Sequence, residues 1–407
     1  MIKPIGHIIA VASLAFFAAC ERTETALTED PEAPQQQTEP QQQTEIAPQQ
    51  EPAIKIEVDT SERQQDTPDA RTATTTALDT QVPQTTTIRN SAQLQAPSAP
   101  FQVRRCMNMG NALEAPNEGD WGYRITAQDL RSVAAAGFDT VRIPIRWDAH
   151  TAHRAPYSID APFMARVNTV VRDAQSAGLG VIIDVHHYED LMARPTREQA
   201  RFLAIWDQIA RNFADAPDTV YFEVLNEPTL QLSNAQVNGL YAKVLPIIRA
   251  TNPTRKVILG GNSWNSIESL DEVRWPLNAN KKDANLVATF HDYGPHAFTH
   301  QGAEWSEPVL PLGRRWGGPA DMDELADTYQ RARDFKAKTG LPIFVGEFGV
   351  IDKVPTAERF AWTKIRRKTM EAHGFSWCAW DFSGAFKSYD LSTRRWFPGA
   401  QDALFGR

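Results

Sequence analysis

Residues 219–228, TVYFEVLNEP, are the stretch that constrains the fold most sharply. The run from Thr219 to Leu225 is apolar, β-branched and aromatic, which is typical of a buried strand. Pro228 lacks the N–H that a sheet ladder needs, so the strand has to end before it. The chain therefore brings the carboxylate of Glu227 to the end of a buried strand, beside the amide of Asn226.

A second stretch, LPIFVGEFG at 341–349, repeats this pattern and places Glu347 between two glycines after an apolar run. Two glutamates at strand ends of one parallel sheet predict an acid/base and nucleophile pair. Either glutamate alone would be explained well enough as a surface residue after a strand. The two together, in their NEP and GEFG settings, favour a catalytic pair.

The N-terminus carries Lys3 and then an apolar segment that ends in small residues and Cys20. Residues 1–20 predict a signal peptide, because this apolar core is too short for a lasting transmembrane helix. The residues before Cys20 resemble a bacterial lipobox, although Phe17 stands where Leu is more common. We expect a lipoprotein signal peptide with lipidation at Cys20, and ordinary signal cleavage nearby is the alternative.

Residues 21–97 contain no aromatic residue, Gly or Cys and are rich in Gln, Thr, Pro and acidic residues. Such a segment cannot bury enough apolar surface to offset its ordering entropy, so we expect a disordered acidic linker. It holds 14 acidic and 5 basic side chains, whereas the whole chain has a formal net charge of −8. Residues 98–407 are therefore close to neutral, and nothing in them indicates a nucleic-acid partner.

Residues 98–407 hold all eleven tryptophans and are long enough for one large α/β domain. Apolar strand candidates alternate with amphipathic helix candidates, which predicts a (β/α)8 TIM barrel. A doubly wound open sheet is the alternative, but no GxGxxG follows the first strand. Strands are expected near 103–109, 139–144, 180–185, 220–225, 256–259, 286–290, 343–345 and 376–379, and helices within 126–137, 163–178, 197–213, 323–340 and 357–374.

Polar side chains gather at the predicted strand ends, where the active sites of such barrels lie. They are Asn111, Glu114, Arg142, His186, His187, Asn226, Glu227, His291, Tyr293, Glu347, Trp380 and Asp381. Any one of them could be structural, but their joint position at one rim favours a site.

Seven motifs resemble glycoside hydrolase family 5 of clan A, and most closely its endoglucanase and mannanase branch, subfamily 25. They are NMGNALEAPNEGDWG (108–122), VRIPIRW (141–147), VIIDVHHYEDLM (181–192), LNEP (225–228), FTHQGAEW (298–305), GEFG (346–349) and WDFSGAFKSYD (380–390). The resemblance covers about residues 101–407. It implies a (β/α)8 barrel and a retaining mechanism that needs neither a metal nor another cofactor.

The resemblance also implies roles for single residues. Glu227 falls on the family's acid/base and Glu347 on its nucleophile. The supporting positions are Arg142, His186, Asn226, His291, Tyr293 and Trp380, and the glycone side of that branch is lined at Asn111, Glu114 and His187. The chain departs from the pattern at Asp292, where relatives have Tyr, at His296 for Phe, at Asp381 for Glu and at Cys106 for Gly. We expect Asp292 and His296 to lie beside the site and to affect substrate preference.

The reaction chemistry assigns each group a task. Glu347 has to stay ionised, with Arg142 and the Tyr293 hydroxyl stabilising its charge. Glu227 has to stay protonated until it acts, which partial desolvation and a negative neighbour favour. Asn226 can bond the sugar 2-hydroxyl. Trp380 offers a flat face to the sugar ring, and core and platform roles are equally compatible with Trp121, Trp264, Trp305 and Trp316.

Two further arrangements are open to the sequence. The histidines 186, 187, 291, 296 and 300, with Asp292, could be imagined as a metal site, but their spacing matches no tight ligand motif, so we expect no metal. Cys106 and Cys378 fall on the first and last strands, which adjoin in a closed barrel. A disulfide is geometrically feasible there, but we expect two buried thiols.

These observations predict an extracytoplasmic, lipid-anchored, monomeric endo-β-1,4-glycanase whose partner is a β-linked polysaccharide. The expected substrates are β-glucans of the cellulose, mixed-linkage and glucomannan types, with mannan left open. Its only membrane contact would be the anchor, with the bacterial outer membrane favoured. A β-mannanase or an oligosaccharide-acting β-glycosidase is the alternative within this class. A non-catalytic polysaccharide-binding lipoprotein is the alternative outside it, and it should have lost a catalytic glutamate.

Overall fold

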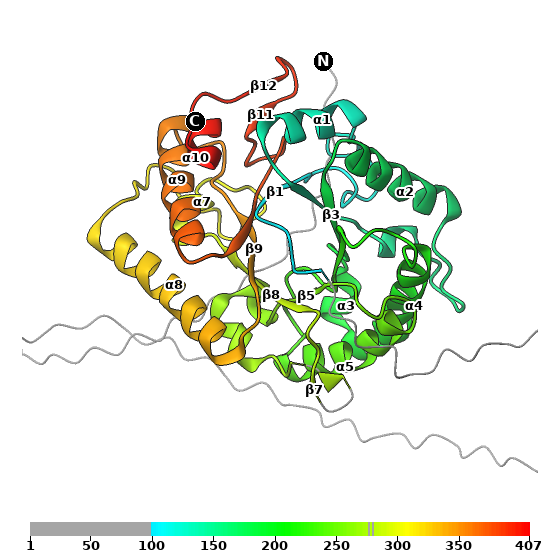
Figure 1. Ribbon diagram of the computed structural model, residues 1–407. Coiled ribbons are helices and arrows are strands. Elements are labelled where there is room, and N and C mark those ends of the chain that lie inside the picture. The colour runs from blue at the N-terminus through cyan, green and yellow to red at the C-terminus, as the bar shows by residue number, and fades with distance from the viewer. Residues whose placement is uncertain (1–98, 276, 279–280) are drawn as a thin grey trace, which may run out of the picture. The chain divides into compact units, whose positions relative to one another are not determined.

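The computed structural model describes residues 99–275, 277–278 and 281–407. The predicted signal peptide, the lipidation at Cys20 and the linker over 21–97 lie outside these described residues. The described chain forms the predicted barrel, in which eight parallel strands close in the order β1-β10-β9-β8-β5-β4-β3-β2 (Figure 1). These strands are β1 (Arg105–Asn108), β2 (Thr140–Ile143), β3 (Gly180–Asp184), β4 (Val220–Glu223), β5 (Val257–Leu259), β8 (Leu286–Asp292), β9 (Ile343–Phe348) and β10 (Ser376–Ala379).

Helices surround the barrel and cover the outer faces of the strands (Figure 1). The longer ones are α1 (Ala127–Ala136), α2 (Ala161–Ser176), α4 (Pro195–Asn212), α5 (Asn234–Thr251), α8 (Pro319–Thr339) and α9 (Thr356–Ala372), and the shorter ones are α3 (Glu189–Ala193), α6 (Asn262–Asn265), α7 (His296–Thr299) and α10 (Ala400–Phe405). α1 shows how the sequence sets these bounds. Thr126 and Asp129 form a capping box at its start, and Gly137 ends it in the left-handed conformation.

One unit departs from the regular strand–helix alternation that the sequence predicts. After β5 the chain forms the single turn α6 and the 3₁₀ helix η3 (Ile267–Glu272), followed by a small hairpin of β6 (Leu277–Asn278) and β7 (Lys281–Lys282). A second hairpin, β11 (Tyr389–Asp390) with β12 (Arg395–Trp396), follows β10. Strands of two residues leave too little periodicity to be detected from sequence.

The inside of the barrel changes from apolar to charged along the strands. Its lower layer is one buried apolar cluster with a residue from each of seven strands, namely Cys106, Ile182, Tyr221, Ile258, Val287, Phe344 and Cys378. Residues two apart in a strand face the same side, so the next inward positions on β1, β3 and β4 hold Asn108, Asp184 and Glu223. Inside the barrel, a layer of polar side chains therefore packs directly on the apolar lower layer.

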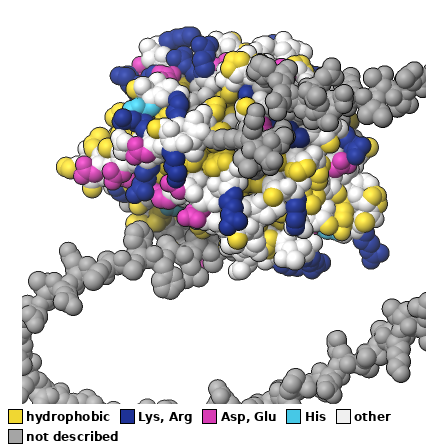
Figure 2. All heavy atoms as spheres, turned by 60° about the horizontal axis from the view of Figure 1, so that its bottom comes forward, with side chains coloured by type: hydrophobic (Ala, Val, Ile, Leu, Met, Phe, Trp, Pro, Cys, Tyr) yellow, Lys and Arg dark blue, Asp and Glu magenta, His cyan; other side chains and the backbone are white. Residues whose placement is uncertain are grey.

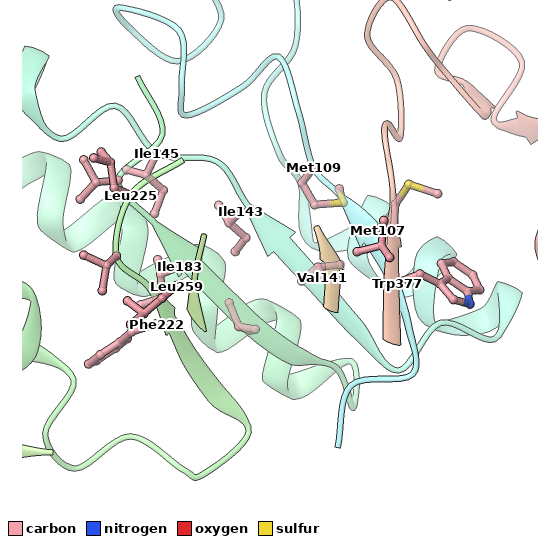
Figure 3. Packing of buried hydrophobic residues seen from close by; sticks show 14 of the residues in the cluster. Met107, Met109, Val141, Ile143, Ile145, Ile183, Phe222, Leu225, Leu259 and Trp377 are labelled. Carbon is pink, nitrogen blue, oxygen red and sulfur yellow. The ribbon is translucent and has the colours of Figure 1, made fainter. Parts of the chain in front are cut away.

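The outer faces of the strands pack against the helices in the main hydrophobic core. Met107, Val141, Ile183 and Phe222 belong to this cluster, and each directly precedes or follows an inward-facing residue in its strand (Figure 3). Burial on both faces explains why the strands are almost continuously apolar in sequence.

The structure corrects the expectation for the two cysteines. Cys106 and Cys378 are joined by a disulfide, not left as two thiols. They are register partners on the adjacent strands β1 and β10, with a Cα–Cα distance of 4.1 Å, and both face into the apolar lower layer. The bridge therefore joins the first and last strands of the barrel.

Within the described part of the chain, no helix has both the length and the apolar character needed to cross a membrane. On the face seen in Figure 2, Lys and Arg side chains are interspersed with acidic and apolar ones. This mixture agrees with the near-neutral charge of residues 98–407.

Candidate active site

Arg142 is the centre of the polar layer, and its side chain is fully buried. It forms a two-point ion pair with Glu223, at 2.6 and 3.0 Å, and a further ion pair with Asp184 at 2.9 Å. Its remaining N–H groups donate to Asn108 at 3.0 Å, to Asn226 at 2.8 Å and to Glu347 at 2.8 Å. Several fixed acceptors around one planar guanidinium hold it in a single orientation.

Glu347, in β9, receives two donors on its two oxygens. Arg142 donates to Oε1 at 2.8 Å and the Tyr293 hydroxyl donates to Oε2 at 2.8 Å. Burial raises the pKa of Glu347 to about 7, while the nearby His291 and Arg142 lower it. Both direct donors favour the ionised form, so Glu347 is built to carry a negative charge in a buried position.

Glu227 follows β4 with a backbone φ of 43°, a left-handed conformation that is uncommon for glutamate. Burial raises its pKa to about 7, and the charge of Arg142 opposes this rise. Its Oε1 lies 2.7 Å from Nδ1 of His291. Its ion-pair partner in the described residues is His291, whose pKa is lowered by burial, so the direct contacts stabilise an anion less at Glu227 than at Glu347.

His291, in β8, links the two glutamates. Its Nδ1 is 3.7 Å from Oε2 of Glu347, and its Nε2 is 3.4 Å from the amide nitrogen of Asn265. An amide NH2 can only donate, so Asn265 favours the tautomer in which Nδ1 carries the hydrogen. His291 then donates to Oε1 of Glu227, which places an acidic proton of Glu227 on Oε2.

Asn226 and His186 each have one polar end bonded within the site and a second polar end that can bond a ligand. Arg142 occupies the carbonyl oxygen of Asn226, so its NH2 group is the end that can bond a sugar hydroxyl. Asp184 lies 2.7 Å from Nδ1 of His186, which makes Nε2 the acceptor. The ring of His186 stacks parallel to that of Trp380 at 5.6 Å between centroids.

Asn111 and Glu114, two of the three predicted glycone-side residues, lie in the loop after β1. Glu114 is buried and accepts hydrogen bonds from the backbone N–H groups of Asn111 and Ala112. Asp381 accepts from the N–H of Gly384 at 2.7 Å, and burial raises its pKa to about 7. Glu114 and Asp381 are therefore buried carboxyls that hold the backbone of these loops.

For four tryptophans the sequence did not distinguish a core role from a sugar-binding role, and three of the four are exposed. Trp121, Trp264 and Trp305 expose 44%, 46% and 46% of their surface, so they are not core residues. Trp121 contacts the edge of His187, whereas Trp316 is half-buried and packs beside Phe298. The first three can offer flat faces to a sugar, whereas Trp316 packs against the outside of the core.

The expectation that Asp292 lies beside the site is wrong. Asp292 is buried, and its carboxylate accepts from the Tyr329 hydroxyl at 2.6 Å and pairs with Arg366 at 3.1 Å, so it faces the helix layer. Adjacent strand residues point to opposite faces, so His291 faces the interior and Asp292 the helices. His296 is exposed and stacks on His300, which in turn contacts Tyr293.

The imagined histidine metal site is not formed by the described residues, where the one group that could hold an ion is Glu227, His291 and Glu347. Sequence reasoning did not single out four site residues, namely Asn108, Asp184, Glu223 and Asn265. For three of them a signal existed, because a polar residue two positions after an inward apolar residue in a buried strand faces the barrel interior. Asn265 is the last residue of the irregular turn α6 and had no such signal.

A closed (β/α)8 barrel with one glutamate after β4 and another in β9 is the arrangement of a glycoside hydrolase. Comparison with known proteins gives the same class. Residues 95–386 match the family described as Cellulase (glycosyl hydrolase family 5), and the chain therefore belongs to that family. Endoglucanase H of Acetivibrio thermocellus is 35% identical over 295 residues, which are 72% of this chain and 31% of that protein. Endoglucanase A of Ruminococcus albus is 28% identical over 73% of this chain and 88% of its own length.

Solved structures of endoglucanases are also similar to this chain. A hyperthermophilic endo-β-1,4-glucanase in complex with substrate is 40% identical, with a TM-score of 0.72, over 75% of this chain and 97% of that one. Thermotoga maritima Cel5A in complex with mannotriose is 39% identical, with a TM-score of 0.71, over 74% of this chain and 97% of that one. The chain spans only about a third of the first two curated relatives, 31% and 37%.

Proposed function

We propose that this chain is a retaining endo-β-1,4-glucanase that acts through a covalent glycosyl-enzyme. The observation that carries the proposal is the asymmetry of the glutamate pair. Among the residues that the structure describes, Glu347 has two direct donors that favour an anion, whereas Glu227 has one partner, His291. One oxygen of each carboxyl lies within 4.8 Å of the other, which fits the roughly 5 Å of retaining sites better than the 6.5 Å or more of inverting ones.

In the first step Glu347 attacks the anomeric carbon, and Glu227 gives its proton to the departing glycosidic oxygen. Glu227 is the more accessible of the two, with 28% of its side chain exposed against 6% for Glu347, as suits a group that meets both leaving group and water. In the second step Glu227, now ionised, takes a proton from water, which attacks the glycosyl-enzyme and releases Glu347. The NH2 of Asn226 bonds the 2-hydroxyl, a contact that strengthens in the transition state.

The proposal is tested by measuring reducing-sugar release by the full chain on carboxymethyl-cellulose, barley β-glucan, glucomannan and mannan. We expect cleavage of the three glucose-containing polymers, and no cleavage by Glu347→Gln. If the wild-type chain binds these polymers without cleaving them, it is a non-catalytic binding protein and the proposal fails.

Mannan is a second candidate substrate. A solved relative at 39% identity, Thermotoga maritima Cel5A, was crystallised with mannotriose and also with cellobiose. If the site bonds mainly remote hydroxyls, pure mannan should be cleaved within about two orders of magnitude of β-glucan. Values of kcat/KM for cello- and manno-oligosaccharides of equal length decide this, and undetectable manno-oligosaccharide cleavage would leave a strict β-glucanase.

We also propose that the protein is exported and held on the membrane by a lipid on Cys20. The Cys106–Cys378 disulfide supports export, since disulfides persist in oxidising compartments. Cys20→Ser should move the protein from the membrane fraction to soluble or unprocessed forms. If the Cys20→Ser variant stays in the membrane fraction, the proposed anchor is wrong. In a separate test, deletion of residues 21–97 should leave activity on soluble substrate unchanged.

A further inference from the structure

Tyr293 lies between two residues that are both held by one buried cation. Asp292, before it, pairs with Arg366 at 3.1 Å. The carbonyl oxygen of Gly294, after it, accepts from Arg366 NH2 at 2.5 Å. Arg366 comes from the middle of α9 and its side chain is fully buried. The carboxylate of the residue before the tyrosine and the backbone carbonyl of the residue after it are thus tied to a single guanidinium.

Other side chains fix this arrangement from two helices. Trp362, four residues before Arg366 on the same face of α9, donates to the same Gly294 oxygen at 2.9 Å and lies under the guanidinium. From α8, Glu324 accepts from Arg366 at 2.6 Å. A Cβ on Gly294 would lie 1.9 Å from Oε1 of Glu324, so a side chain there would displace this carboxylate from Arg366.

Fold stability alone does not explain why Arg366 and its ion-pair partners are buried here. Burying an arginine with its partners costs desolvation energy, and well-packed apolar residues often stabilise a fold as well or better. The Nε of Arg366 also has no hydrogen-bond partner among the described residues. What the ion pair adds is direction, because a planar fork holds two acceptors at fixed positions.

We propose that Arg366, with Asp292 and Gly294, forms a clamp that positions the Tyr293 hydroxyl on Oε2 of Glu347. The clamp rests on the proposed function, in which Glu347 is the nucleophile. Its members do not touch the reacting atoms, so they are positioning residues that act through Tyr293. A loosened clamp lets the hydroxyl move off the carboxylate, which weakens charge stabilisation in the reaction and leaves the sugar contacts in place.

The test is a double-mutant cycle on the full chain with Asp292→Asn and Tyr293→Phe. Asp292→Asn keeps shape and removes the charge, and we expect kcat to fall about tenfold with KM within about twofold. In the Tyr293→Phe background the same change should alter kcat by less than about twofold, because the hydroxyl it positions is gone. An equal tenfold fall in both backgrounds, or no fall in the wild type, would overturn the clamp.

A second variant and a control keep the result interpretable. Glu324→Gln is a milder change at a partly exposed position. It should lower kcat less than Asp292→Asn does, and again only when Tyr293 is present. If Asp292→Asn does not fold, the cycle with Glu324→Gln tests the clamp in its place. Asp283→Asn breaks another buried pair, with Arg249 at 2.7 Å, and should lower the melting temperature without lowering kcat. A Glu347→Gln variant with full activity would refute the proposed function itself, whereas a failed cycle refutes only the clamp.

Discussion

The hydroxyl of Tyr293 donates to Oε2 of Glu347 at 2.8 Å, while Arg142 occupies the other oxygen of the same carboxylate. Both contacts favour the charged form of Glu347, against a burial that raises its pKa to about 7. The site therefore balances desolvation with two donors, and removing one of them should have a measurable effect.

Tyr293→Phe should shift the acidic side of the pH–activity profile. A hydrogen bond to the ionised form lowers a pKa, so its loss raises the pKa of Glu347, and activity should begin to fall at a higher pH as the solution is acidified. The alkaline side, which reports deprotonation of Glu227, should move less. The profile of kcat/KM measures both sides. An acidic side that stays in place would mean that this hydroxyl does not stabilise the carboxylate.

Glu227→Ala should separate the two chemical steps. With an aryl glycoside whose leaving group needs no acid, the first step should proceed and the glycosyl-enzyme should accumulate. Azide, a small anionic nucleophile that needs no general base, should then speed turnover and give a β-glycosyl azide. The assignment of Glu227 as acid/base is wrong if azide leaves the rate unchanged.

Asp381→Asn should stabilise the fold at alkaline pH but not at acidic pH. Burial raises the pKa of Asp381 to about 7 from its usual 3.8, so ionisation is harder in the folded chain. The folded state then binds more protons than the unfolded state between these values, and stability falls as pH rises through that window. Asparagine removes this loss and keeps an acceptor for Gly384. Melting temperatures of both proteins at pH 4 and pH 8 test it; an equal difference at both would contradict the pKa.

Removing the disulfide should weaken the fold and leave the chemistry intact. The bridge closes a loop with a sequence separation of 272 and lies in the apolar lower layer, away from the polar layer with Arg142. Replacing Cys106 and Cys378 with alanine should lower the free energy of unfolding by about 2–4 kcal/mol. A reducing agent should lower the melting temperature of the wild type only. A large fall in kcat of the folded variant would show that the bridge reaches the site.

Much of the barrel was predictable because each strand is a short apolar run with a polar end. All eight predicted strands are present, and the two glutamates lie together at one rim, where parallel strands bring their carboxyl ends. The hairpins β6–β7 and β11–β12 were not predictable, since strands this short are set by their surroundings.

The site residues that the sequence did not predict correctly depend on which face of a barrel strand each side chain points to. Asp292 and His291 are neighbours in sequence, yet one faces α8 and α9 and the other the glutamates. Their roles follow only once the strand's register is known, because a shift of one residue exchanges the two faces. The pairing of Cys106 with Cys378 likewise needed the register of β1 against β10.

The most direct measurement of the central claim is covalent labelling with a 2-deoxy-2-fluoro-cellobioside that carries a dinitrophenyl leaving group. The fluorine slows both steps, and the good leaving group keeps the first one fast enough for the glycosyl-enzyme to accumulate. Mass spectrometry of the digested protein should find the sugar on the peptide that contains Glu347, and Glu347→Gln should stay unlabelled. A label on Glu227, or inactivation without any covalent sugar, would contradict the account.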